Sequence, residues 1–570
     1  MGNNSEAHIC QCLSRLITLR RNSTVMININ ANGHEKSRKT GMQFAEGVVS
    51  LARGLVQLGL KPGDVVAIAA LNSDSYLEWL LAVTYIGGIA APFNYRWSLE
   101  EARLAMNEVN PILLVTDKSC DHWHSKLQSH LSWHVSMTAI ESSSYDDVLT
   151  TELLKSSSLK SVRLLPAPNN AAILCFTSGT SGRPKAVIIS HSALVVQSLA
   201  KLALVGYSEN DIYLHTSPLC HVGGISSALA MLMIGSCHVF IPKFEVKSAI
   251  RAIEQHHVTS LITVPAMMAD LISSARAVET TKQFETVTKI LNGGGGLLPG
   301  LIEKAVQVFP RAKLISAYGM TEACSSLTFM TLYDPTIGSY NQHPQMNIGE
   351  SSNLIRQSGG VCVGKPAPHV ELQISSNGAS QAGKILMRGP HVMLGYWGQI
   401  PSKASSPADV GWFDTGDIGQ IDDNGNLWLI GRNSGRIKSG GENVYPEEVE
   451  GVILQHPGVS TVIVVGLPDS RLTEMVVACI QLKDNWQWSE FSSHNSVNAE
   501  DRYLSKEILQ KFCKEKNLTG FKIPRSFILW MTPFPMTTTG KVRRDQLKKE
   551  AMSLWPNGNP LSGGLLLSSL

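Results

Sequence analysis

A glycine-rich loop between two apolar segments is the first place where the side chains could do chemistry. The loop spans residues 177–185, and the segments 171–176 and 186–189 on either side have the composition of buried strands. Hydroxyls and backbone N–H groups of such a loop can converge on an anion, glycine allows close approach, and a lysine adds a mobile charge. The loop therefore predicts a polyphosphate site with these candidate contacts: Thr177, Ser178, Gly179, Thr180, Ser181, Gly182 and Lys185.

The spacing of this loop differs from that of a Walker A loop. A Walker A loop has four residues between its glycines, followed by Gly-Lys-Ser/Thr. Here Gly179 and Gly182 are three apart, and Arg183 and Pro184 come next. A serine- and glycine-rich surface turn would have the same composition, so the prediction depends on the other motifs of the chain.

Two further motifs could contact a flat, negatively charged ligand. Four glycines follow Asn292, and a backbone without side chains suits a flat ligand lying against it. The segment from Tyr318 to Glu322 offers an aromatic ring for stacking, the hydroxyl of Thr321 and a carboxylate suitable for Mg²⁺.

Three single residues with reactive side chains stand on expected turns. His221 lies between a proline and paired glycines, where functional loops concentrate, although a structural histidine would have the same neighbours. Asp417 is expected to present a carboxylate on a turn, and Lys541 ends the hydroxyl-rich loop 535–541. None of the three is decisive by itself.

The overall composition excludes several classes of partner. The 49 basic and 46 acidic residues give a net charge of +3 without long charged blocks, so nucleic acid and anionic membranes are not expected as partners. The best candidate span, residues 79–93, is about five residues shorter than the ~20 that cross a bilayer, and no transmembrane segment is expected. The ten cysteines are scattered, without the spacing of a zinc site.

The apolar pattern predicts the fold class. From residue 44 to 116, helix-like and strand-like segments alternate, which predicts a largely parallel sheet with helices on both faces. Residues 118–168 are polar and are interpreted as an irregular surface insertion, and the composition changes at about residue 433. We therefore expect an N-terminal domain over 1–433, a smaller domain over 434–556 and a flexible tail over 557–570.

The two ends of the chain carry possible targeting signals. Apolar residues between 9 and 17 share one helical face with arginines alongside, which fits either an organellar presequence or the first helix of the fold. The chain ends in a tripeptide that differs from the peroxisomal Ser-Lys-Leu address only at its centre, so a peroxisomal import receptor is a candidate partner of Ser568, Ser569 and Leu570.

Taken together, the motifs resemble those of the adenylate-forming superfamily, which includes acyl-CoA synthetases, luciferases and peptide-synthetase adenylation domains. Within it, segments such as 213–219, 318–331 and 440–450 are most similar to the plant 2-succinylbenzoate–CoA ligases of phylloquinone synthesis. The motifs occur in the order and spacing of the superfamily, at residues 177–185, 318–322, 415–417, 431–432, 438–443 and 535–541.

The resemblance implies both a fold and a reaction. A large N-terminal domain would combine parallel-sheet α/β layers with a distorted antiparallel barrel, and a small mobile α+β domain would follow it. ATP, Mg²⁺, coenzyme A and a carboxylic acid would react in two steps. The carboxylate displaces pyrophosphate to give an acyl-adenylate, and the CoA thiol then displaces AMP. Joining two anions requires charge neutralisation and positioning.

The resemblance also implies roles for single residues in the first step. The 177–185 loop would grip the β- and γ-phosphates, Thr321 would contact the α-phosphate and Glu322 would hold Mg²⁺. Lys541 would bridge the carboxylate and the α-phosphate in the transition state. Tyr318 would stack on adenine and two residues would bind the ribose, so that the implied adenosine contacts are Gly294, Gly295, Gly296, Ala317, Tyr318, Gly319, Asp417 and Arg432.

For the second step, the resemblance implies a rotation of the small domain about a hinge at Ser434. The hairpin that carries Lys438, Gly440 and Gly441 would then line the tunnel for the pantetheine arm of CoA. His221 would close the acyl pocket toward this tunnel. Two positions depart from the superfamily pattern of the phosphate loop, since this chain has Ser181 for threonine and Ala186 for glycine.

Alternatives remain open on sequence alone. The same chemistry could act on 4-coumarate, benzoate or a medium-chain fatty acid, although small or polar pocket candidates such as Gly293 and Ala317 suit a compact aromatic acid. A luciferase-like oxidative enzyme and an inactive scaffold are alternatives of another class. Phylloquinone synthesis and the terminal tripeptide together indicate the peroxisome, the chloroplast or both.

Overall fold

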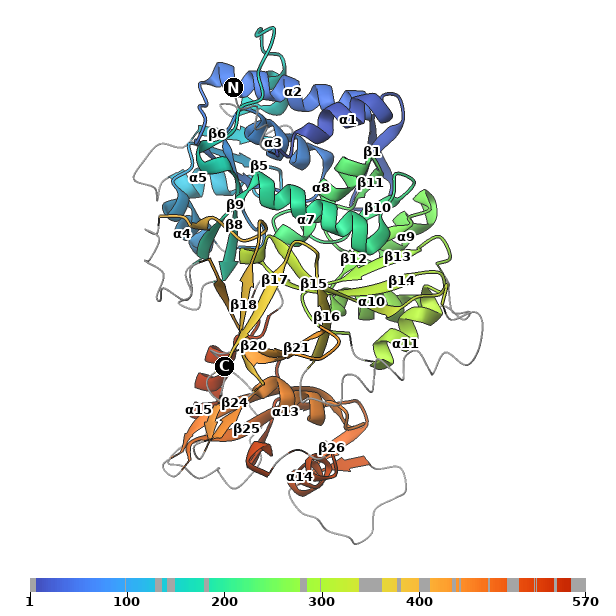
Figure 1. The fold of residues 1–570 in the computed structure, drawn as a ribbon, viewed down its shortest axis with the longest axis vertical. Coiled ribbons are helices and arrows are strands. Elements are labelled where there is room, and N and C mark those ends of the chain that lie inside the picture. The colour runs from blue at the N-terminus through green and yellow to red at the C-terminus, as the bar shows by residue number, and fades with distance from the viewer. Residues whose placement is uncertain are drawn as a thin grey trace.

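The fold consists of two β-sheets with helices between and around them, followed by a smaller C-terminal unit (Figure 1). The computed structural model describes residues 7–97, 99–128, 136–140, 149–178, 184–276, 284–297, 299–337, 361–376, 381–398, 411–432, 437–439, 442–469, 472–489, 502–516, 518, 520–537 and 541–554.

The first sheet has eight strands and carries the predicted phosphate loop. Its middle strands are parallel, as expected from the alternating pattern, whereas β8, β9 and β19 are joined antiparallel at one edge. Its order is β19 (Gly395–Tyr396), β9 (Pro184–Ser190), β8 (Ala171–Ser178), β4 (Ile89–Pro92), β3 (Val65–Ala69), β5 (Leu113–Thr116), β6 (Ser136–Ala139) and β7 (Leu149–Thr150).

The second sheet runs through thirteen strands and changes character along its length. From β1 to β14 its pairs are parallel, and from β14 to β17 they are antiparallel and curve away toward the C-terminal unit (Figure 1). Its order is β17 (Glu371–Ser375), β18 (Gly383–Arg388), β20 (Phe413–Ile421), β21 (Leu427–Arg432), β16 (Val361–Pro366), β15 (Ser325–Tyr333), β14 (Lys313–Met320), β13 (Lys289–Asn292), β12 (Ser260–Thr263), β10 (Ile212–His215), β11 (Cys237–Phe240), β1 (Thr24–Ile29) and β2 (Glu35–Thr40).

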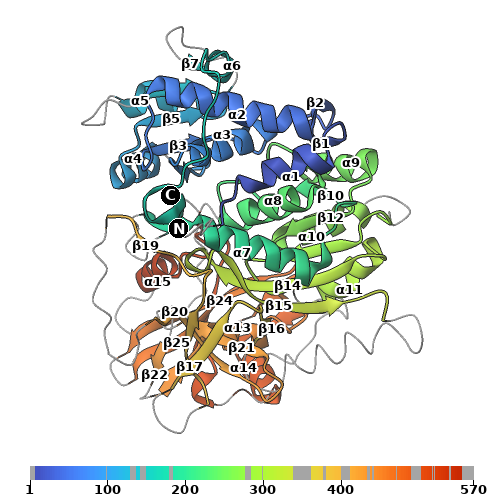
Figure 2. The ribbon, with the colours of Figure 1, turned by 45° about the horizontal axis from the view of Figure 1, so that its top comes forward.

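Helices pack between and outside the two sheets. Figure 2 shows the ribbon of these helices beside the two sheets. One apolar cluster joins α1, α2, α3, α7 and α8 to both sheets, and separate clusters lie under α4 and α5 and under α9 to α11. The helices are α1 (Gln11–Leu19), α2 (Gly41–Leu58), α3 (Asp74–Tyr85), α4 (Leu99–Val109), α5 (Trp123–Gln128), α6 (Thr151–Lys155), α7 (His191–Lys201), α8 (Val222–Ile234), α9 (Val246–His256), α10 (Pro265–Arg276) and α11 (Pro299–Val308).

Local sequence explains why the central helices begin and end where they do. Thr40 and Gln43 form a reciprocal capping box at the start of α2, and Gly59 adopts a left-handed φ of 99° just past its end. The hydroxyl of Ser190 accepts a bond from Ala193 N at the start of α7, directly after β9. The phosphate-loop hairpin is therefore connected rigidly to α7.

The C-terminal unit is an α+β structure with its own buried clusters, which contain only residues beyond 436. Its main sheet is β23 (Glu442–Val444), β22 (Ile437–Ser439), β25 (Thr473–Leu482) and β24 (Val459–Asp469), with β28 (Ser526–Leu529) beside β25. It also contains α13 (Pro446–Ile453), α14 (Lys506–Glu515), α15 (Arg544–Ser553) and the pair β26 (Trp486–Trp488) and β27 (Arg502–Leu504). The expected mixed α/β fold with a large first and a small second domain is confirmed, while the boundary at 433 lies outside the described residues.

Two sequence-based interpretations need correction. The segment 118–168 is not irregular throughout, because β6 extends the first sheet parallel to β5 and the side chain of Trp123 in α5 is only 1% exposed. Asp417 is not on a turn but within β20, opposite Arg432 of β21. In both cases sheet pairing decides the local structure, and short polar segments give little sign of such pairing.

The N-terminal apolar face belongs to the fold. Ile9, Leu13 and Leu16 are at most 4% exposed and lie in the cluster that α1 shares with α2 and α8. Of the two interpretations of this segment, the first helix of the fold is the one that agrees with this burial. Within the described part of the chain, no helix is both long and apolar enough to cross a membrane.

Candidate active site

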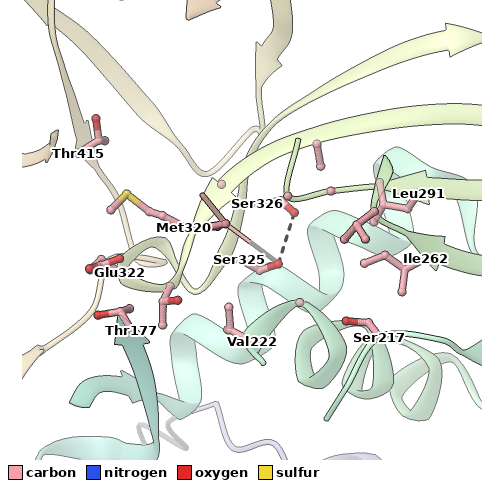
Figure 3. A pocket seen from close by; sticks show the side chains of 18 of the residues that line it. Thr177, Ser217, Val222, Ile262, Leu291, Met320, Glu322, Ser325, Ser326 and Thr415 are labelled. Carbon is pink, nitrogen blue, oxygen red and sulfur yellow. Dashed lines mark hydrogen bonds between the residues drawn. The ribbon is translucent and has the colours of Figure 1, made fainter. Parts of the chain in front are cut away.

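A cavity of about 450 Å³ is lined by residues of both sheets, of α8 and, through Lys541, of the C-terminal unit. Figure 3 shows Thr177, Glu322 and Thr415 on one side of it and Ile262 and Leu291 on the other. The cavity brings together eight of the residues expected to act in the site: Thr177, Lys185, Gly294, Ala317, Gly319, Thr321, Glu322 and Lys541.

The predicted phosphate loop connects the strands of a hairpin. β8 and β9 pair antiparallel so that Thr177 lies opposite Lys185, and both residues line the cavity. The ammonium of Lys185 is 5.3 Å from the ring centroid of Tyr396 in β19, a cation–π distance. The strand–loop–strand prediction is confirmed for the flanking strands, whereas Gly179, Thr180, Ser181, Gly182 and the side chain of Ser178 lie outside the described residues.

Glu322 presents a buried carboxylate to the cavity. It follows β14 in a single 3₁₀ turn, η3 (Thr321–Ala323), and is 9% exposed. The hydroxyl of Tyr396 donates a hydrogen bond of 3.0 Å to its Oε1 atom. Burial and the charge of Glu322 raise the pKa of Tyr396, so this hydroxyl keeps its proton at neutral pH and orients the carboxylate.

The residues expected to hold adenosine come from neighbouring strands. The hydroxyl of Tyr318, in β14, donates a bond of 2.7 Å to Oδ2 of Asp417 in β20. Asp417 is 6% exposed and pairs in register with Arg432. Although Asp417 lies in a strand and not on a turn, it is still next to Arg432, as the motifs predicted, because β20 pairs with β21.

The glycine run after β13 is open on one side. Gly294 has a φ of 72°, in the left-handed region that favours glycine, and lines the cavity. The side-chain amide of Asn292 donates a bond of 2.7 Å to the carbonyl of Gly295 and fixes the turn. Gly295 and Gly296 are exposed beside it but do not line the cavity.

Lys541 reaches the cavity from the C-terminal unit. Two hydrogen bonds join its backbone to Thr537. Thr537 N donates to the carbonyl of Lys541 at 2.7 Å, and Lys541 N donates to the hydroxyl of Thr537 at 3.1 Å. Strand-like pairing of Met536 with Val542 closes the same loop. This short loop therefore positions the lysine opposite the strand ends of the large domain.

His221 lies at the start of α8, as the residue that precedes its first turn. Burial, followed by the charges of Arg96 and Lys541, lowers its pKa to about 4, so the imidazole is neutral at pH 7. The cavity wall includes the next two residues, Val222 and Gly223, but not His221 itself. The structure thus brings His221 near Lys541, at the edge of the cavity.

The hairpin expected to line the CoA tunnel is partly described. β22 and β23 pair antiparallel with Lys438 opposite Asn443, which confirms a hairpin. Gly440, Gly441 and the expected hinge Ser434 lie outside the described residues, as do the side chains of Lys438 and Arg432. Their roles stay predictions.

Among the residues of the cavity wall that the sequence analysis missed are two with ionisable side chains. Tyr396 was part of a segment interpreted only as a short strand, and Lys201 belongs to an apolar stretch without a motif. No spacing could have found them, because each reaches the cavity through tertiary contacts made by β19 and α7.

The fold and the cavity define a class of protein. A two-sheet α/β domain with a hydroxyl-rich hairpin, a buried carboxylate and a lysine delivered by a second, smaller domain is the architecture of adenylate-forming enzymes. The chain belongs to the AMP-binding enzyme family, whose model matches residues 18–397, and the model of the AMP-binding enzyme C-terminal domain matches residues 448–541.

Individual relatives are similar over nearly the whole chain. The 2-succinylbenzoate–CoA ligase, chloroplastic/peroxisomal, of Arabidopsis thaliana is 51% identical and covers 97% of this chain and 98% of its own length. The indoleacetate–CoA ligase of Aromatoleum aromaticum is 29% identical over 89% of this chain and 92% of its own. The o-succinylbenzoate CoA synthetase of Bacillus subtilis, solved with its acyl-adenylate intermediate, has a TM-score of 0.73 at 26% identity and covers 95% of this chain and 98% of its own.

Proposed function

We propose that this chain is an ATP-dependent acid–CoA ligase that converts 2-succinylbenzoate to 2-succinylbenzoyl-CoA in phylloquinone synthesis. The observation that carries the proposal is the 51% identity to the Arabidopsis ligase over 97% of the chain. The cavity agrees with this chemistry, because a phosphate-loop hairpin, Glu322 and Lys541 meet in it beside an apolar wall. The indoleacetate relative also joins an acid to CoA, by its name, which supports the reaction type independently of the acid.

In the first step the chain would neutralise charge between two anions. Lys185 and the hydroxyls of the hairpin loop bind the β- and γ-phosphates, and Thr321 contacts the α-phosphate. Lys541 bridges the incoming carboxylate and the α-phosphate, where negative charge accumulates. Tyr318 stacks on adenine over Gly294, and Asp417 accepts bonds from the ribose hydroxyls.

Magnesium would be held by Glu322. Mg²⁺ prefers oxygen ligands and is usually bound by one or two carboxylates together with substrate phosphates. Glu322 fits this set, because it is a single buried carboxylate on the cavity wall that Tyr396 orients through one oxygen. A solved Bacillus subtilis synthetase contains ATP and a magnesium ion, at 26% identity to this chain. When bound, the ion would screen the charge of the phosphates.

In the second step the C-terminal unit would rotate so that CoA replaces Lys541. The division into residues 1–433, 434–556 and a tail over 557–570, with a hinge at Ser434, is part of this proposal. Separate apolar clusters on the two sides of the boundary support it, because each unit keeps its own core during a rotation. The 438–443 hairpin would then guide the pantetheine arm, and His221 would close the acyl pocket.

The proposed location is the peroxisome, the chloroplast or both. The Arabidopsis relative is named chloroplastic/peroxisomal. The terminal Ser568, Ser569 and Leu570 would bind a peroxisomal import receptor. Fusing these three residues, or a Leu570→Asp version as control, to a fluorescent reporter tests this part separately.

The direct experiment is CoA-dependent AMP formation from ATP and Mg²⁺ with a panel of acids. We expect 2-succinylbenzoate to be strongly preferred over 4-coumarate, benzoate and octanoate. Preference for one of the other acids would support an acid–CoA ligase but contradict 2-succinylbenzoate as its substrate. Oxygen uptake without CoA would instead indicate luciferase-type chemistry, and no pyrophosphate release with any acid would indicate a scaffold.

A further inference from the structure

A lysine is buried at the end of α7, away from the predicted motifs. Lys201 is the last residue of α7, is 0% exposed and is followed by a π-helical turn, η2 (Leu202–Gly206). Lysine is almost never fully buried without a partner of opposite charge. Such a position therefore requires an explanation.

Neutral groups of α8 surround the ammonium of Lys201. Its Nζ atom is 2.6 Å from the hydroxyl of Ser226, 3.0 Å from that of Ser227 and 3.4 Å from the carbonyl of Gly223. Among the residues that the structure describes, no carboxylate acts on the charge of Lys201. The positive charge is solvated by oxygen dipoles but not neutralised.

Burial therefore dominates the protonation of Lys201. It lowers the pKa of the amine to about 7, and the smaller electrostatic effect of Cys324 acts in the opposite direction. A nearby anion would favour the charged form of the amine. A fixed carboxylate would have produced the opposite shift.

Lys201 also lines the ligand cavity. Ser217, Val222, Gly223 and Ser326 belong to the same wall, and Gly223 has open space where a Cβ would project. In Figure 3 Val222 lies between the group around Glu322 and the group around Ile262 and Leu291. The lysine thus reaches the cavity beside the first turn of α8 and separately from the phosphate-binding hairpin.

We propose that Lys201 binds the second carboxylate of the acid substrate, the one that is not activated, and thereby selects dicarboxylic acids. The proposal rests on the function proposed above, since 2-succinylbenzoate carries two carboxylates. One carboxylate meets Lys541 and the α-phosphate, and the other would pair with Lys201 beside Ser326. The neighbouring serines and the apolar wall of Ile262 and Leu291 would exclude water from this pair.

The substitution Lys201→Met tests this role. It removes the ammonium group and leaves the carbonyl oxygens that accept hydrogen bonds from Ser226 and Ser227. Ser226 and Ser227 keep their own bonds, to the carbonyl of Val222 at 2.7 Å and to that of Gly223 at 2.8 Å. An unpaired buried charge is costly, and its replacement by an apolar side chain of similar length leaves no opposite charge without a partner. We therefore expect K201M to melt at the same temperature as the wild type or higher.

The readout is kcat and KM for three acids that differ only in their carboxylates. The probes are 2-succinylbenzoate and its two analogues with one carboxylate each, 4-oxo-4-phenylbutanoate and 2-propanoylbenzoate. For K201M we expect KM for 2-succinylbenzoate to rise about 30-fold or more, as for a buried charge pair that loses one partner. KM for the analogue that still turns over should change less than about threefold, and KM for ATP should not change.

A matched control is Lys243→Met. Lys243 is 53% exposed in its side chain and pairs with Glu245 at 3.0 Å, away from the cavity wall. This variant should match the wild type with all three acids. It reports any effect of losing one positive charge from the protein as a whole.

The outcomes separate this inference from the function it rests on. If wild-type enzyme does not use 2-succinylbenzoate, the proposed function fails, whatever the variant does. If the wild type uses it and K201M raises KM equally for the diacid and the single-carboxylate analogue, Lys201 only shapes the pocket and the inference is overturned. A rise in KM for ATP instead of the acid, or a lowered melting temperature with loss on every acid, overturns it as well.

Discussion

Lys541 and Lys201 line the same cavity from two contrasting regions of the molecule. Lys541 is exposed on a short loop of the C-terminal unit that two bonds to Thr537 hold in shape. Lys201 is fully buried where α7 packs on α8, in the middle of the large domain. An exposed loop can move out of the site between two half-reactions, whereas a side chain within a packed core cannot.

The difference suggests a division of labour. The charge that develops on the α-phosphate during adenylation must be neutralised only in that step. Lys541 suits this task because its exposed loop can move out of the site afterwards. A carboxylate that stays charged throughout the reaction needs a permanent partner, which suits Lys201. The following predictions test this contrast, beginning with the largest expected effect.

Lys541→Ala should lower the rate of adenylation by about 10²–10³-fold, as expected for the loss of one preorganised donor to developing negative charge. Thioester formation from synthetic acyl-adenylate and CoA should remain within about threefold of wild type. Pyrophosphate release and CoA consumption measure the two half-reactions separately. Equal loss of both would contradict a role limited to the first step.

Glu322→Gln should raise the Mg²⁺ concentration needed for half-maximal adenylation by at least about tenfold, because the neutral amide is a weaker ligand. Tyr396 would retain a hydrogen-bond acceptor at position 322, so the fold should survive. A magnesium titration of pyrophosphate release provides the measurement. An unchanged magnesium requirement with reduced rate would assign Glu322 to another task.

The pH dependence of the preference for the diacid should test the role of Lys201. Because burial lowers the pKa of Lys201 to about 7, the ammonium form of the free enzyme decreases about tenfold for each pH unit above that value. The kcat/KM for 2-succinylbenzoate, divided by that for the single-carboxylate analogue, should therefore fall as pH rises from 7 to 9. K201M should show a flat ratio. A sloping ratio in the variant would exclude Lys201 as its source.

Tyr318→Phe should have the smallest effect. The variant keeps the ring that would stack on adenine and loses the 2.7 Å bond to Asp417. One hydrogen bond to a charged group corresponds to a change of about tenfold, so KM for ATP should rise by about this factor or less. KM for the acid should stay constant, and a change there would place Tyr318 against the acyl group instead.

The sequence by itself indicated the part of the site that lies in short contiguous stretches. The predicted phosphate loop, the glycine run, the Tyr318–Glu322 segment and the Lys541 loop are contiguous stretches of mostly small or polar residues. In the proposed function their backbone N–H and hydroxyl groups bind the nucleotide. The alternating apolar pattern likewise determined the parallel strands and central helices. These features depend on local spacing, which a single chain displays directly.

Only the tertiary structure decided the rest. Asp417 lies in a strand because β20 pairs with β21. Residues 118–168 contribute the strands β6 and β7 because β5 offers an edge to which β6 adds, followed by β7. Tyr396 reaches Glu322 across 74 positions of sequence, and Lys201 meets Ser226 across 25. Contacts of this kind arise from the packing of helices and sheets around a shared core, and neither residue type nor sequence spacing predicts them.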